Sequence, residues 1–160
     1  MNGAHLHIML THGPVAGVIF GVILLAAAIW RNNEQLKQLS LIVFAAVGLL
    51  TVAVYLSGEG AEEIVERLPE VTESVIEPHE EAAVWSLIGA LVLGVFSLGG
   101  LVFFRGRSLP NWLTRSLLIA SLIVSGIIAW TAHLGGEINH PEIRSADQAA
   151  VSTEQQDEHN

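Results

Sequence analysis

Residues 17–30, GVIFGVILLAAAIW, and residues 117–130, LLIASLIVSGIIAW, decide the fold of this 160-residue chain. Both runs are apolar on every helical face, whereas a membrane β-strand would alternate apolar and polar residues. Four stretches approach or exceed the roughly 20 apolar residues that cross a hydrocarbon core, and they cover roughly residues 14–31, 38–57, 82–104 and 112–134. We therefore expect an all-α fold, a bundle of four transmembrane helices.

The composition agrees with a membrane protein. Hydrophobic residues make up 51% of the chain and charged residues only 14%, which is more apolar than a soluble domain of this size. The first apolar run has no basic residue before it and no small-residue cleavage site, so we expect it to be retained rather than removed as a signal peptide. The chain has no cysteine, which excludes disulfides, thiolate metal sites and thioether-attached haem.

The basic residues predict the orientation in a bacterial inner membrane. Five of the seven Lys and Arg residues follow the first or third apolar run or begin the fourth, and these are Arg31, Lys37, Arg105, Arg107 and Arg115. Short connections rich in Lys and Arg face the cytoplasm. Both termini and the long second connection should then face the periplasm, together with 15 of the 16 acidic residues. This acidic outer surface argues against nucleic acid as a partner and favours cations.

The long connection after the second apolar run has a pattern of its own. Ile64, Leu68, Val71 and Val75 follow helical spacing, with glutamates between them. The pattern predicts an amphipathic surface helix, bent or broken at Pro69, that covers the outer end of the bundle over residues 59–77.

The remaining boundaries follow from Pro and Gly. Pro14 is expected in the first turn of the first helix, and Pro78 at the start of the third. Gly135 and Gly136 predict that the fourth helix ends there, followed by an irregular or single-turn segment from Glu137 to His140. Residues 1–144 then form the transmembrane domain, and residues 145–160 a flexible acidic tail.

Histidines and glutamates from distant segments are predicted to meet at the outer membrane surface. Imidazole with carboxylate suits a divalent transition metal such as Zn, Fe, Mn, Cu or Ni, without distinguishing among them. The expected site holds one or two ions for metal handling or redox chemistry, and whether it catalyses turnover stays open. The candidate ligands are His7, His12, Glu59, Glu62, Glu63, His79, Glu80, Glu137 and His140. Glu62 and Glu63 could instead orient imidazoles, and His133 would replace His140 if the helix continued through the glycines.

Two other functions fit the same residues. One is a b-type haem cytochrome for electron transfer, with the haem held between two of His12, His79 and His133. The shortage of outer Lys and Arg and the excess of glutamate argue against an anionic haem there. The other is an accessory structural subunit, because the ridge formed by Gly13, Gly17 and Gly21 suits a homo-oligomer or a larger membrane complex equally.

Four segments also carry a resemblance. The motifs HLHIMLTHGP, SGEGAEE, EPHEEAA and GGEINHPEI resemble a family of small four-helix bacterial inner-membrane proteins of uncharacterised activity, over about residues 5–144. The resemblance implies the same fold, an outward N-terminus and a shared set of residues, which are His7, His12, Glu59, Glu62, His79, Glu80, Glu137 and His140.

Overall fold

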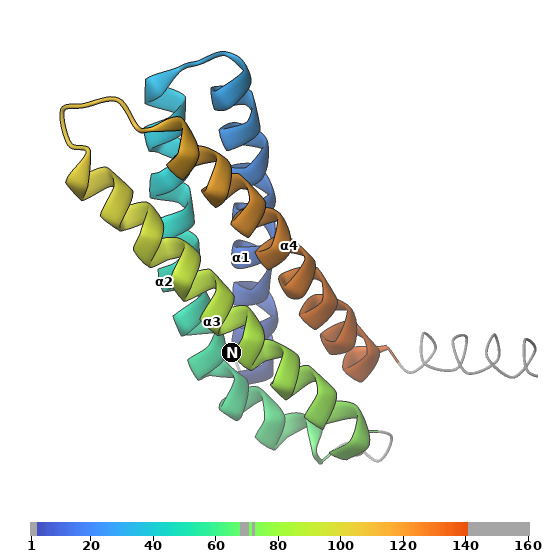
Figure 1. The fold of residues 1–160 in the computed structure, drawn as a ribbon. Helices are drawn as coiled ribbons and strands as arrows, with labels where there is room; N and C mark the ends of the chain where they lie inside the picture. Colours follow the sequence, from blue (N-terminus) through green and yellow to red (C-terminus); the bar gives the residue numbers. More distant parts are fainter. Residues whose placement is uncertain (1–2, 68–70, 72, 141–160) are drawn as a thin grey trace, which may run out of the picture.

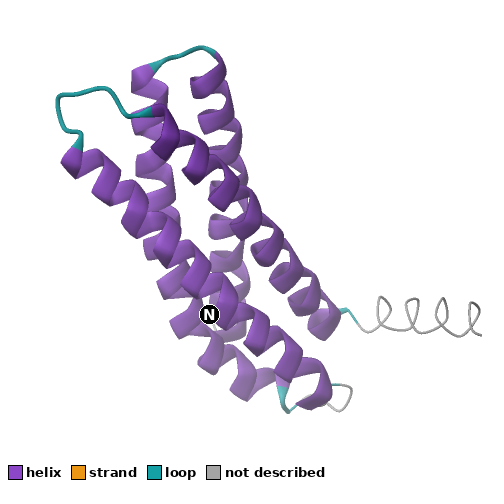
Figure 2. Cartoon of the chain, in the orientation of Figure 1, coloured by secondary structure: helices purple, strands orange, loops and turns teal. Residues whose placement is uncertain are grey.

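The computed structural model describes residues 3–67, 71 and 73–140, and these residues form four long helices. They are α1 (Gly3–Trp30), α2 (Glu34–Val65), α3 (Glu73–Phe103) and α4 (Asn111–Asn139) (Figures 1 and 2). Each helix is long and apolar enough to cross a membrane. This confirms the predicted all-helical fold with four candidate membrane spans.

The helices run up and down in the order of the sequence (Figure 1). Helix α1 packs against α2 and α4, and α3 packs against the same two helices, so α1 and α3 are diagonally opposite. Because the helices alternate in direction, the bundle has two ends, and each end gathers segments from all four helices. The histidine end comprises residues 3–12, 54–67, 73–82 and 130–140. The basic end comprises the two short connections with their flanking turns, residues 30–37 and 103–115.

Small residues allow the helices to approach closely. The Gly13, Gly17 and Gly21 ridge faces α2, where a Cβ atom placed on Gly17 would lie 2.7 Å from the Val47 side chain. A Cβ on Gly48 of α2 would lie 2.9 Å from the Ala90 carbonyl oxygen of α3. The glycine ridge therefore serves packing inside this chain, which is how small residues hold membrane helices together.

The bundle is apolar outside and partly polar inside. Leu49 and Val95 are 74% and 66% exposed, as expected for side chains that face lipid. The interior holds the hydroxyl groups of Ser40, Thr114 and Ser121, all fully buried. Each donates to a carbonyl oxygen three residues earlier in its own chain, so burial leaves these hydroxyls satisfied.

All four helices extend further toward the histidine end than the predicted boundaries, and α2 runs on to Val65. Helix α1 begins at Gly3, which places Pro14 inside the helix, and α3 begins at Glu73, which places Pro78 inside. Each proline removes one backbone N–H donor, but the long apolar helices continue through it because tertiary packing stabilises them. Helix α4 runs through Gly135 and on to Asn139, so the predicted irregular segment is wrong.

The structure does not support the separate amphipathic helix between the second and third spans. Ile64 lies in the last turn of α2, and Val75 lies near the start of α3. These two residues belong to two different long helices that extend past their apolar segments, and Val71 lies between the helices. Leu68 and Pro69, like the predicted tail at residues 145–160, lie outside the described residues.

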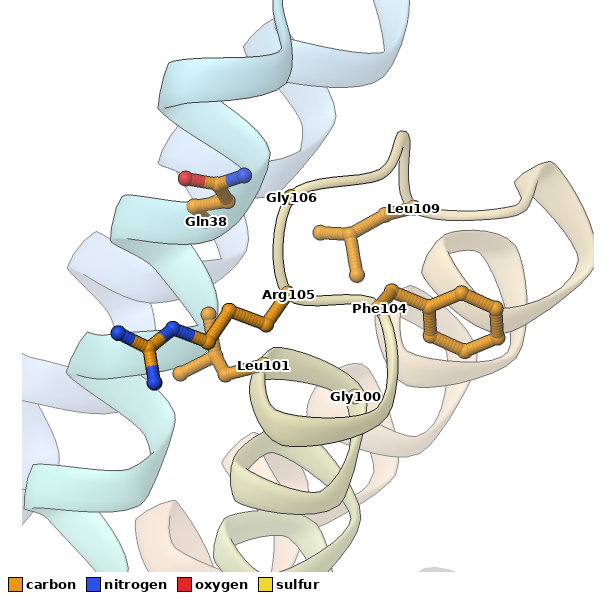
Figure 3. A pocket seen from close by; sticks show the side chains of 7 residues that line it. All are labelled: Gln38, Gly100, Leu101, Phe104, Arg105, Gly106 and Leu109. Carbon is orange, nitrogen blue, oxygen red and sulfur yellow. The ribbon is translucent and has the colours of Figure 1, made fainter.

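Polar contacts join the two connections at the basic end. Glu34 accepts a hydrogen bond from the backbone N–H of Leu109 at 2.6 Å through one carboxylate oxygen. Its other oxygen lies 3.5 Å from the Nζ atom of Lys37, which is buried and also donates to Asn32 at 3.3 Å. Glu34 thereby ties the start of α2 to the α3–α4 connection. A small hollow of about 110 Å³ lies beside this contact, and Leu109 and Arg105 line it (Figure 3).

Candidate functional site

His7 lies in α1 at the histidine end and is half-buried. Its Nδ1 atom is 3.2 Å from the carbonyl oxygen of Val54 and 2.9 Å from the hydroxyl of Ser57, both on α2. Ser57 in turn donates its own proton to the Val54 carbonyl at 2.7 Å. Both partners therefore accept from His7, so Nδ1 carries the ring proton and Nε2 presents a lone pair.

His79 is held in the same way on α3. Its Nδ1 atom donates to the carbonyl oxygen of Thr131 on α4 at 3.0 Å, and the ring is half-buried. Gly135 makes room for this ring, because a Cβ atom there would lie 2.9 Å from the imidazole carbon Cε1. The Nε2 atom of His79 therefore also presents a lone pair.

Thr131 joins α3 to α4 beside His79. Its hydroxyl donates to the carbonyl oxygens of Ala82 and Ile127, each at 3.0 Å. Because this hydroxyl has only one proton, Ser86 is the donor in the 2.8 Å contact between the two hydroxyls. Thr131 thus contributes its carbonyl to His79 and its hydroxyl to α3, which fixes both the ring and the helix that carries it.

The two half-buried imidazoles lie at the same end of the bundle. They are carried by α1 and α3, which are diagonally opposite. Each ring is anchored by a backbone carbonyl of a different helix, Val54 of α2 or Thr131 of α4. All four helices therefore contribute to the placement of these two rings.

A carboxyl pair lies at the same end. The nearby Glu80 of α3, ahead of burial, raises the pKa of the Glu62 carboxyl of α2 above its ordinary value. Glu80 is the residue after His79, so one carboxyl of the pair and one of the two imidazoles are carried by the same turn of α3.

The other candidate ligands have local contacts instead. His12 is exposed, and its Nδ1 atom donates to the Ile8 carbonyl of its own helix at 2.8 Å. His133 lies 3.1 Å from Glu137 on the exposed side of α4. Glu63 pairs with Arg67 at 2.8 Å at the end of α2.

Glu59 and His140 complete the list of predicted ligands. Both are exposed, at the last turns of α2 and at the end of α4 respectively. The backbone N–H of His140 donates to the Gly136 carbonyl at 2.9 Å, which closes the helix. Within residues 3–67, 71 and 73–140, no three His, Asp or Glu side chains come close enough together to hold a metal ion.

Two residues that position the imidazoles were not among the predicted ones. Ser57 and Thr131 are hydroxyl residues near the ends of apolar helices, where lipid-facing side chains would be expected to be apolar. Their position opposite histidine-bearing segments at the same depth is the one sequence signal that could have indicated them.

The structure is a bundle of four helices, each long and apolar enough to cross a membrane, with two anchored imidazoles and a pair of glutamates at one end. No family model, curated protein or solved structure matches the chain.

Proposed function

We propose that this is a bacterial inner-membrane protein that binds a divalent transition-metal ion at its histidine end, on the periplasmic side. The observation that supports this most strongly is the anchoring of His7 and His79 through Nδ1 to backbone carbonyls. Metal-bound histidines almost always donate their second ring N–H in this way, which fixes the tautomer and directs Nε2 to the metal.

The two imidazoles supply part of a coordination shell. Zinc in proteins takes about four ligands, and other first-row ions take four to six. The proposed site therefore needs water ligands in addition, because among the described residues no third His, Asp or Glu side chain comes close enough to share an ion with the two imidazoles. When bound, the ion would supply Lewis acidity or a redox centre. The chain's own contribution is to orient two imidazoles and to hold acidic groups beside them.

The test is a metal titration with matched histidine variants. Chelator-treated protein in detergent is titrated with Co²⁺, whose visible spectrum reports nitrogen ligation, and metal content is measured by elemental analysis. His7→Ala and His79→Ala should each weaken binding by roughly tenfold or more, as expected for loss of a ligand. His12→Ala is the control, because His12 lies on the same helix as His7 but is exposed and bonded to its own backbone. Equal binding by all four proteins, or no binding by any, would refute the proposal.

A second candidate is supported by the same pair of rings. Two imidazoles on diagonally opposite helices, each with Nε2 available, also suit the two axial positions of a b-type haem. Of the three histidines that the sequence predicts as haem ligands, only His79 belongs to this pair. The second axial ligand would be His7, because His12 and His133 make contacts within their own helices. A purified protein with a Soret band that shifts on reduction, and that is lost in His7→Ala, would favour haem over a metal ion.

A further inference from the structure

An open groove runs along the outside of the bundle between α3 and α4, toward the histidine end. It has a volume of about 570 Å³ and is lined by residues between positions 78 and 85 of α3 and between positions 126 and 134 of α4. The groove is separate from the imidazole pair, since neither His7 nor His79 lines it. Its walls are mainly apolar, and Gly126 leaves it open, because a Cβ atom there would meet nothing within 4 Å.

The groove changes character along its length. Gly126 and Ile127 lie within the apolar part of α4, where the surrounding solvent is hydrocarbon. Toward the histidine end it is flanked by Trp85 and Trp130, each 58% exposed. Tryptophan is enriched at the boundary between hydrocarbon and headgroups, so the groove crosses that boundary.

The charge at the headgroup level is negative. Of the described residues that line the groove, Glu81 is the only one with a formal charge, and it lies one turn from Trp85. A carboxylate that lines the same groove as two tryptophan rings favours an ammonium group, through charge pairing and through contact with the ring faces. It disfavours a headgroup with net negative charge.

We propose that this groove binds one phospholipid with an ethanolamine headgroup, with the ammonium at Glu81 and an acyl chain along Gly126. The proposal is independent of the metal site, because it uses a different face of α3 and α4. Its occupant is a bilayer lipid, since the apolar part of the groove opens to hydrocarbon and its polar end carries the complementary charge.

The test compares two lipids that differ in the headgroup alone. Purified protein in detergent is supplied with palmitoyl-oleoyl phosphatidylethanolamine or phosphatidylglycerol, and retained lipid per chain is counted by native mass spectrometry. Both lipids carry the phosphate, so they differ in the ammonium of one headgroup and the uncharged glycerol of the other. The unchanged protein should retain the ethanolamine lipid about fivefold better, the size expected for one exposed charge pair with tryptophan contact.

Two variants separate the headgroup contact from the groove itself. Glu81→Gln should reduce the preference to less than about twofold, while Glu77→Gln, one turn away on α3 and outside the groove lining, should keep it. Gly126→Leu fills open space and should abolish retention of both lipids, whereas Gly99→Leu fills open space elsewhere and should not.

Several results would overturn the proposal. Equal retention of the two lipids by the unchanged protein would do so, as would a preference that survives Glu81→Gln. Retention unaffected by Gly126→Leu would show that lipid binds elsewhere. A dimer that dissociates on Gly126→Leu would show that a second copy of the chain occupies the groove.

Discussion

Replacement of Gly135 by alanine tests the anchoring of His79 directly. The new Cβ would lie 2.9 Å from the imidazole Cε1 atom and 3.3 Å from Nδ1, so the ring has to move. Nδ1 is the atom that donates to the Thr131 carbonyl at 3.0 Å, and a shift of the ring breaks or lengthens this bond. Gly136 is the matched control, because it is the next residue of the same helix and its Cβ would meet nothing within 4 Å.

The two variants share one effect and differ in another. Alanine replaces glycine within α4 in both, which stabilises the helix by up to about 1 kcal/mol. At Gly135 this gain is opposed by the lost hydrogen bond, about 1 kcal/mol, and by the overpacking, about 1 kcal/mol or more. Gly136→Ala should therefore be neutral or stabilising, and Gly135→Ala should be less stable than it by about 2 kcal/mol.

The assay is reversible unfolding by sodium dodecyl sulfate in mixed micelles, followed by circular dichroism. The imidazole nitrogens, followed by nuclear magnetic resonance, provide a second readout of the His79 tautomer. If the two variants have the same unfolding midpoint and the same His79 nitrogen shifts, His79 is not held against Gly135 as described. The proposed metal site would then lose its main support.

Two further predictions follow from the helix packing and the orientation. Gly48→Ala should lower the free energy of unfolding by about 1–2 kcal/mol, because its Cβ would lie 2.9 Å from a backbone carbonyl of α3 that moves only with the helix. Gly99→Ala is the control and should not lower it, because a Cβ at Gly99 would meet nothing within 4 Å. Equal stabilities of the two variants in the same unfolding assay would contradict the close contact between α2 and α3. The chain has no cysteine, so single cysteines can report the orientation. Glu59→Cys, at the histidine end, should react with a membrane-impermeant maleimide on intact spheroplasts, and Ser108→Cys, at the basic end, should react only after lysis. The reverse pattern would place the histidine end in the cytoplasm.

The four helices could be predicted from the sequence because the requirement that sets them is local. A run that is apolar on every face, such as residues 17–30, has to satisfy its backbone within itself in lipid, and a helix does so without any partner. The glycine ridge was likewise visible as a packing surface. Its partner was not, since three glycines at a spacing of four fit α2, a second copy or another protein equally well.

The helix ends were harder, because local and tertiary effects oppose each other there. Pro14, Pro78 and the pair Gly135–Gly136 each weaken a helix locally, and the sequence alone therefore predicts boundaries at them. In the structure the helices continue through all of them. At Gly135 the reason is specific: the residue faces His79, and a side chain would displace the ring. The missing side chain of Gly135, which suggested an end of the helix, leaves the space that the His79 ring of α3 occupies.

The placement of the histidines follows from these extended helices. Because α1 begins at Gly3, His7 and His12 lie on one continuous helix, and five residues at about 100° each turn their side chains about 140° apart. The two side chains therefore cannot both face the bundle axis. His7 faces α2 and contacts the Val54 carbonyl, whereas His12 bonds to the Ile8 carbonyl of its own helix. Which of the two faces inward depends on where the helix packs. The decisive acceptors, the carbonyls of Val54 and Thr131, are groups that every residue has, so no residue type marks them in the sequence. A prediction from side-chain chemistry could therefore locate the end of the bundle where histidines gather, but it could not select the pair that the backbone anchors.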